Sequence, residues 1–341
     1  MLRIARLVRR HPQLVALFGF ASGVGSYLLV ERREAAAQLI AVLMLLSWAW
    51  LVLENALHAG VLQRFGLDMP RTVMRFATQM VHQEGLFFAL PFFIAATTWG
   101  DGHALFTTLL ALCALTALID PLYYNVLAPR RWLFVVFHAL TLFAVLLVAL
   151  PLLVHLGSEQ SLIVALASAL LFSLPSIATL LPEERWWRRV PLLLLLLLAL
   201  AAGLWQARSW IPPAALRLVE MSVTQSIDRA ARQPGPSLAR IDAAELGRNG
   251  LYAWTSVRAP RGLHEQIHHV WLHDGREVDR IALDIEGGRK AGYRGWSHKL
   301  NFPNPASGAW QVRVVTDAGQ LIGATRFTIG GTIESAASRQ P

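Results

Sequence analysis

The chain has 341 residues, of which 55% are hydrophobic and 16% are charged, and its formal net charge is +9. The charge is spread evenly, at +4 over residues 1–207 and +5 over residues 208–341, which excludes a concentrated nucleic-acid-binding surface. The single cysteine, Cys113, excludes a domain held together by disulfides and is expected to be an apolar packing residue.

Seven apolar stretches occupy the first 210 residues. Their approximate bounds are 13–30, 36–58, 83–99, 104–128, 132–156, 160–181 and 190–210. A helix needs about 20 mostly apolar residues to cross a bilayer core of about 30 Å, and only a helix satisfies its own backbone there. We therefore predict a polytopic transmembrane domain of about seven helices over residues 1–211, with the lipid bilayer as its partner.

Arginines mark alternate connections between these stretches. The N-terminus and the second, fourth and sixth connections hold 12 arginines, whereas the first connection holds only Arg32 and Arg33. Excess basic charge stays in the cytoplasm during membrane insertion. With an odd number of spans, this pattern predicts a cytoplasmic N-terminus and a periplasmic location for the residues after about 211.

The segment before the third stretch begins with a helix-start signal, Asp68-Met-Pro-Arg71. It favours either a cytoplasmic interfacial helix or the first part of a long, tilted third span. Both interpretations place Arg71 and Arg75 at the lipid headgroups.

Ionisable residues inside the apolar stretches form one candidate site, because such groups are costly in lipid and tend to face the bundle interior. They are Glu54, His58, His82, Glu84, Asp120 and His138. A metal site or a proton path built from them would make the protein a membrane-embedded enzyme or transporter. The alternative is that they form interhelical hydrogen bonds. The sequence has no paired metal-binding motif that would favour the metal site.

The last third of the chain alternates apolar and polar residues in short runs, which predicts strands. The expected strands are Leu216–Ile227 (which also fits a helix), Leu251–Val257, Gln266–His273, Arg276–Ile285, Trp310–Thr316 and Leu321–Ile329. Asp274-Gly275 is typical of a tight hairpin turn. We predict a soluble, immunoglobulin-like β-sandwich over residues 212–330, followed by a disordered tail over residues 331–341. The predicted fold is thus a multi-domain α + β protein.

Two groups of side chains in this β domain are candidate ligand-binding residues. His269 and His273 would point to one face of a strand beside Trp271 and could share a metal. The favoured alternative is that Trp271 lies in the core with His269 hydrogen-bonded beside it, because no cysteine or close carboxylate completes a ligand set. Arg289, Arg294, Trp296 and Lys299 form a basic, aromatic run that could hold an anionic or sugar-like ligand. The alternative for this run is a solvated strand edge with Trp296 packed inward.

The last third also resembles the DUF2914 domain, a bacterial family of unknown function. The residues that carry the resemblance are Tyr252-Ala-Trp-Thr255, His269-Val-Trp271, Asp274-Gly275, Glu277-Val278, Gly287-Gly-Arg289, Arg294-Gly-Trp-Ser297, Lys299, Gly308-Ala-Trp-Gln-Val312, Asp317 and Gly319. The region before it is similar to DUF5924 in its layout. These resemblances imply a membrane-tethered β domain of the bacterial envelope, and they imply no activity, cofactor or catalytic residue.

Together, these patterns predict a multi-pass protein of the bacterial inner membrane whose periplasmic β-sandwich binds an envelope protein or a glycan. The spacing of serines, histidines and carboxylates singles out no catalytic group, so a non-enzymatic role is favoured. No cofactor, resident metal or nucleic-acid partner is expected, and no oligomeric state is indicated.

Overall fold

A computed structural model describes residues 38–49, 71–100, 102–178, 185–246 and 249–330. The chain divides into two compact units, Met1–Ala215 and Leu216–Pro341. The predicted span at residues 13–30 and the predicted tail at residues 331–341 lie outside the described residues, as do Glu54 and His58.

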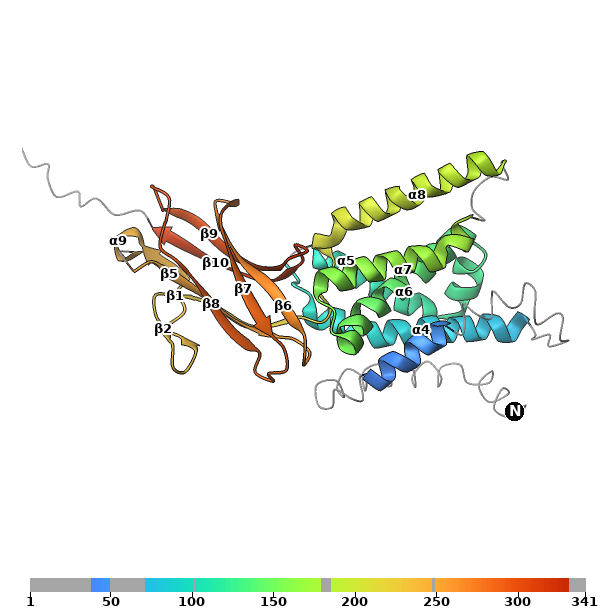
Figure 1. The fold of residues 1–341 in the computed structure, drawn as a ribbon, viewed down its shortest axis with the longest axis horizontal. Coiled ribbons are helices and arrows are strands. Elements are labelled where there is room, and N and C mark those ends of the chain that lie inside the picture. Colours follow the sequence, from blue (N-terminus) through green and yellow to red (C-terminus); the bar gives the residue numbers. More distant parts are fainter. Residues whose placement is uncertain (1–37, 50–70, 101, 179–184, 247–248, 331–341) are drawn as a thin grey trace, which may run out of the picture. The chain divides into compact units, whose positions relative to one another are not determined.

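The first unit is helical in its described parts (Figure 1). Its elements are the helix Gln38–Ala49, α4 (Arg71–Ala96), α5 (His103–Leu118), the π-helix η2 (Leu122–Leu127), α6 (Arg131–Val154), α7 (Ser158–Ala178), α8 (Trp186–Gln206) and the short 3-10 helix η3 (Ala207–Trp210).

The prediction of a seven-span bundle is wrong. Among the described residues, two helices are long and apolar enough to cross a membrane, Arg131–Val154 and Trp187–Trp210. The apolar helices Gln38–Ala49, His103–Leu118 and Ser158–Leu174 are shorter. These helices give only a weak indication of membrane association by length and composition.

The helices predicted from the apolar stretches were too long, because composition does not reveal where a helix is interrupted. At 1.5 Å per residue, the 16 residues of α5 extend about 24 Å, short of a bilayer core of about 30 Å. The helix ends at Leu118, just before Asp120 and Pro121, and the chain continues as a π-helix. α4 is long enough, but its first half carries Arg75, Gln79 and His82.

The helical unit exposes large apolar side chains in addition to those that it buries in its core. Large apolar side chains such as Leu105, Leu195 and Leu198 are exposed, whereas Gln79 and His82 are buried. In the membrane-candidate window of α8, none of the residues is buried. Such a surface is unusual for a soluble protein, because large exposed apolar patches normally mark an interaction with another protein or with lipid.

The second unit is built from strands (Figure 1), which confirms a β domain in this part of the chain. The strands are β1 (Arg217–Thr224), β2 (Ile227–Asp228), β3 (Gln233–Pro234), β4 (Arg240–Asp242), β5 (Leu251–Arg258), β6 (His264–His273), β7 (Arg276–Glu286), β8 (Tyr293–Lys299), β9 (Gly308–Thr316) and β10 (Leu321–Gly330), with the short helix α9 (Ala243–Leu246) after β4. The segment that fitted either a strand or a helix is therefore a strand, β1.

Two sheets enclose the core of the β unit. One has the strand order β1-β5-β8 and the other β4-β10-β9-β6-β7, with β4 parallel to β10 and the other pairs antiparallel. Strands of both sheets contribute to the main core cluster, for example Ala253 of β5 and Trp271 of β6. Alternation along each strand then fixes which side chains point into this core and which point outward.

The hairpin predicted at Asp274-Gly275 joins β6 to β7 and is confirmed. Both residues have positive φ, 47° and 80°, which is the conformation of a type I′ turn whose twist matches that of the paired strands. β8 was not among the predicted strands, although it carries three of the candidate ligand-binding residues, Arg294, Trp296 and Lys299.

Candidate functional site

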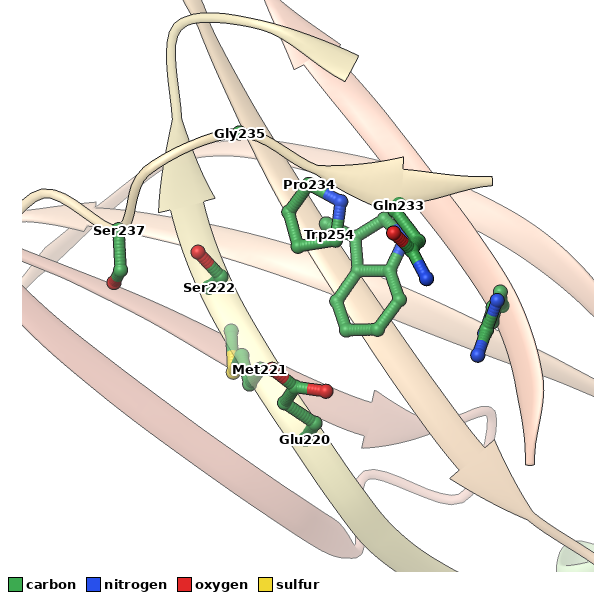
Figure 2. Close-up of a pocket in the computed structure, with 9 residues that line it drawn as sticks. Glu220, Met221, Ser222, Gln233, Pro234, Gly235, Ser237 and Trp254 are labelled. Carbon is green, nitrogen blue, oxygen red and sulfur yellow. The ribbon is translucent and has the colours of Figure 1, made fainter. Parts of the chain in front are cut away.

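A pocket of about 380 Å³ lies on the outer face of the three-stranded sheet (Figure 2). β1 and β5 form its floor, and the segment 225–238, which contains β2 and β3, forms a wall. Its lining residues are Glu220, Met221, Ser222, Gln233, Pro234, Gly235, Ser237, Trp254 and Arg294. Most of these side chains are polar, so the pocket suits a ligand that forms hydrogen bonds.

Strand pairing explains why the polar groups gather here. Ser256 of β5 pairs with Glu220 of β1 on one side and with Arg294 of β8 on the other, so an acid and a base flank one row of the sheet. The next outward-facing row holds Ser222, Trp254 and Trp296. Residues two apart in a strand share a face, which places both rows on the outer surface.

The hydroxyl of Ser222 is the most unusual group in the pocket. Ser222 is only 5% exposed, and its Oγ has no hydrogen-bond partner. Buried polar atoms are nearly always hydrogen-bonded, and leaving one unpaired costs about 1–3 kcal/mol. The Oγ atom is itself covered, so a ligand that lines up with it in the pocket would have to displace neighbouring side chains to satisfy it.

Arg294 and Arg232 hold the wall of the pocket against β8. The guanidinium of Arg294 donates to the carbonyl of Ala231 at 3.3 Å. Arg232 lies over the rings of Tyr293 and Trp296, at 5.7 and 5.9 Å from their centroids. Trp254 is 2% exposed and donates its indole N–H to the carbonyl of Arg232 at 3.1 Å. The wall is thus anchored by two hydrogen bonds and two cation–π contacts, and the side chain of Arg294 also lines the pocket.

Lys299, predicted to be part of the same basic run, lies elsewhere. It lies two positions after Ser297 and four after Gly295, so it points into the sandwich and not onto the outer face. Lys299 is 3% exposed, and its Nζ donates to Asp279 at 2.8 Å. Its position indicates a structural ion pair between the edge strands of the two sheets. Arg289 is also outside the pocket and lies over Tyr293, 5.3 Å from the ring centroid.

His269 and Trp271 are both core residues of the β unit. The two ring nitrogens of His269 are hydrogen-bonded to the hydroxyls of Thr255, at 3.0 Å, and Ser297, at 2.9 Å. Burial lowers the pKa of His269 from 6.5 to about 3, so the ring is neutral at physiological pH. His269 and Trp271 therefore have the packing role that the sequence left open as the alternative.

His269 and His273, the two histidines that could have shared a metal ion, are each hydrogen-bonded to other groups instead. His273 donates to the carbonyl of Ser307 at 3.0 Å and stacks on Trp310. Over the part of the chain that the structure describes, no group of three or more histidine, cysteine, aspartate or glutamate side chains is arranged to hold a metal ion.

The helical unit brings some of the predicted intramembrane residues together. His82 of α4 and His138 of α6 are in contact, with 2.9 Å between the ring nitrogens. Asp120 is linked to this region through Gln79, which donates to its carboxylate at 2.8 Å. Glu84 is half-buried on α4. His82 and His138 are thus in direct contact, whereas Glu54 and His58 lie outside the described residues, so a site built from all six residues stays a prediction.

The fold and these two polar sites define a protein with a helical, apolar-surfaced unit and a β-sandwich that carries a polar surface pocket. Residues 1–253 match DUF5924, a family of unknown function, and the chain belongs to this family. Residues 264–329 match DUF2914, a protein family of unknown function. The order of these two matches confirms the order expected from the sequence. Comparison with curated proteins gives no match.

Sequence reasoning missed several residues of both sites. Glu220, Ser222, Gln233 and Ser237 are single polar residues without a motif, and only the pairing of β1 with β5 and the path of segment 225–238 place them together. Gln79 and Tyr123 are also polar residues without a motif. Their hydrogen bonds depend on partners about 40 residues away, so spacing alone carried no signal.

Proposed function

We propose that this protein is a binding protein of the bacterial inner membrane whose β unit recognises an acidic glycan of the envelope in the surface pocket. The observation that carries the proposal is the unpaired hydroxyl of Ser222 in a polar pocket that also contains Arg294 and Glu220. A guanidinium pairs well with a carboxylate, and serine and glutamate oxygens can accept hydrogen bonds from sugar hydroxyls.

Membrane anchoring is supported by the exposed apolar surface of the helices and by the two ends of α8. An arginine lies over a tryptophan ring at each end: Arg188 over Trp187 at 4.6 Å and Arg208 over Trp205 at 5.0 Å. Tryptophan and arginine are typical of the two membrane–water interfaces. α6 and α8 are both long and apolar enough to cross, so the proposal is a multi-pass anchor.

The charge at the start of α8 supports a periplasmic location for the β unit. Arg185, Arg188 and Arg189 lie at its N-terminal end, whereas Arg208 is the single arginine near its C-terminal end. Because excess arginine stays on the cytoplasmic side, a membrane-crossing α8 delivers the following residues to the periplasm. This argument requires only α8 to cross the membrane and does not depend on the total number of spans.

The binding proposal is tested with the full-length protein in lipid nanodiscs and a hexuronic-acid disaccharide, measured by isothermal titration calorimetry. A neutral hexose disaccharide of the same linkage is the ligand control. Arg294→Gln is expected to weaken binding of the acidic sugar by about tenfold or more, because hydrogen bonds to charged groups contribute about 1.5–3 kcal/mol. Arg289→Gln is the matched control, since Arg289 carries the same charge but does not line the pocket.

Ser222→Ala separates binding from folding. Removing an unpaired buried hydroxyl should leave the stability of the β unit unchanged or raise it, while weakening sugar binding. If the acidic sugar does not bind, or if binding is equal in Arg294→Gln and Arg289→Gln, the pocket is not a site for acidic glycans.

A further inference from the structure

A second polar site lies in the helical unit, where three helical elements each contribute one titratable side chain to a hydrogen-bonded line. His82 comes from α4, Tyr123 from the π-helix η2 and His138 from α6. The Nδ1 atom of His82 is 2.8 Å from the hydroxyl of Tyr123, and its Nε2 atom is 2.9 Å from Nδ1 of His138. His82 and Tyr123 are buried, and His138 is half-buried.

Both ring nitrogens of His82 therefore form hydrogen bonds with titratable side chains. A neutral imidazole has one N–H donor and one bare acceptor nitrogen. If Tyr123 donates to His82, then His82 donates to His138. If His138 donates to His82, then His82 donates to Tyr123. The line thus has two complementary hydrogen-bonded arrangements of neutral groups, which differ only in the positions of the protons.

The surroundings hold this line in place. Trp48 contacts both imidazoles, at 5.6 Å from His82 and 4.7 Å from His138, and Phe134 and Phe137 lie against His82. Among the described residues, the titratable groups next to this line include Tyr124, in ring contact with Tyr123, Arg75, which lies near Tyr124, and Asp120, which is reached through Gln79.

The position of Tyr123 depends on a local departure from α-helical geometry. After Asp120 and Pro121, the chain winds as a π-helix over Leu122–Leu127. π-helical turns are rare and are often found at functional sites. Gln79 donates to the carbonyl of Ala117 at 3.0 Å and to Asp120, which fixes α4 to the residues just before this turn.

We propose that Tyr123, His82 and His138 form a proton-transfer relay within the helical unit. In one transfer, His138 releases the proton of its Nε2 to water, and its Nδ1 takes the proton from Nε2 of His82. His82 Nδ1 takes the hydroxyl proton of Tyr123, and the phenolic oxygen takes a proton from a hydronium ion. One proton enters and one leaves, and all three side chains end neutral. This relay is independent of the sugar pocket and does not require it.

The relay is tested with the full-length protein in liposomes that contain a pH-sensitive dye, after an imposed pH step and with the membrane potential clamped. The wild type is expected to dissipate the pH difference faster than protein-free liposomes. His82→Gln, His138→Gln and Tyr123→Phe should each return the rate to the protein-free value. Glutamine can form hydrogen bonds on both sides but cannot pass a proton through a ring.

His155→Asn is the matched control. His155 lies at the end of α6 with a φ of 55°, a left-handed conformation that asparagine tolerates, so this variant should keep the wild-type rate. A wild-type rate equal to that of protein-free liposomes would overturn the relay. So would a His82→Gln rate equal to that of the wild type.

A measurement on the wild type tests the relay even if the variants do not fold. In histidine-labelled protein in nanodiscs, ¹⁵N NMR should detect coupling across an N–H···N hydrogen bond between one Nε2 and one Nδ1 nitrogen. Absence of this coupling in the folded wild type contradicts the geometry of the relay. Stoichiometric Zn²⁺ binding that both histidine variants lose, without proton flux, would assign a metal site in place of the relay.

Discussion

The helical unit and the β unit both bury histidines, but they do so in opposite settings. In the helical unit, His82 is buried in a mainly apolar core, and large apolar side chains such as Leu195 are exposed on the surface. In the β unit, the core is apolar, with Trp271 and Trp310 at its centre, and polar side chains line the outer face. The contrast lies at the surface, because the described helices expose large apolar side chains, whereas the outer face of the three-stranded sheet carries polar ones.

The partners of the buried histidines differ in the same way. His82 is hydrogen-bonded to another imidazole and to a phenol, both of which can exchange protons. His269 is hydrogen-bonded to the hydroxyls of Thr255 and Ser297, which do not ionise in the physiological range. Burial alone therefore does not separate the two histidines, whereas the chemistry of their hydrogen-bond partners does.

The largest expected effect concerns the integrity of the β unit. A fragment of residues 264–329, the extent of the DUF2914 match, lacks β1 and the central strand β5 of the three-stranded sheet. It would leave Trp271 without Leu251 and Ala253 in its core, so we expect it to be unfolded. A fragment of residues 216–330 should fold. Circular dichroism and NMR dispersion distinguish the two, and cooperative unfolding of the shorter fragment would show that β5 is dispensable.

The next effect compares the surfaces of the two units. Leu195→Arg places a charge on the exposed apolar face of α8 and should oppose membrane insertion by about 3 kcal/mol. Val278→Arg makes the same kind of change on an exposed apolar residue of the β unit and should alter stability by no more than about 0.5 kcal/mol. Alkaline extraction of membranes measures insertion. Equal insertion of Leu195→Arg and the wild type would argue against lipid around α8.

The smallest expected effect tests whether His269 has only a packing role in the core. Its pKa falls from 6.5 to about 3 on folding, so below pH 6.5 the unfolded chain binds a proton that the folded chain does not. Stability is therefore full above pH 6.5 and is lost as the pH falls towards 3. The loss between pH 7 and pH 5 should be about 2 kcal/mol, at about 1.4 kcal/mol per pH unit.

Urea unfolding of the 216–330 fragment at several pH values measures this dependence. His269→Gln should remove this part of the slope between pH 6.5 and pH 5, whatever its effect on stability at pH 7. An unchanged slope in His269→Gln would mean that another group controls the pH dependence.

Local features of the fold could be predicted from the sequence, and features that depend on distant partners could not. Asp274-Gly275 specifies its own turn, so the hairpin of β6 and β7 was found without any knowledge of the rest of the fold. The length of α5 was overestimated, because the leucines continue past the point where Pro121 redirects the chain. Lys299 was placed with Arg294 by proximity in sequence, whereas strand alternation sends one inward and the other outward.

The same distinction between local features and distant partners applies to the residues of the candidate sites. Ionisable residues in apolar stretches pointed to His82 and His138, since such residues are rare enough to be singled out by type. The contact between them spans 56 positions and follows from helix packing. Ser222 had no distinguishing feature as a residue, because an unpaired hydroxyl is a property of its surroundings in the folded chain.

The border between the two family matches has a consequence for how such proteins can change over time. The first match ends at residue 253, inside β5, and the second begins at residue 264 with β6, so both contribute strands to one core. A recombination event at this border would separate strands that stabilise each other and leave neither half with a complete interior. Lineages that exchange this β-sandwich are therefore expected to do so near residue 216, where one compact unit gives way to the next.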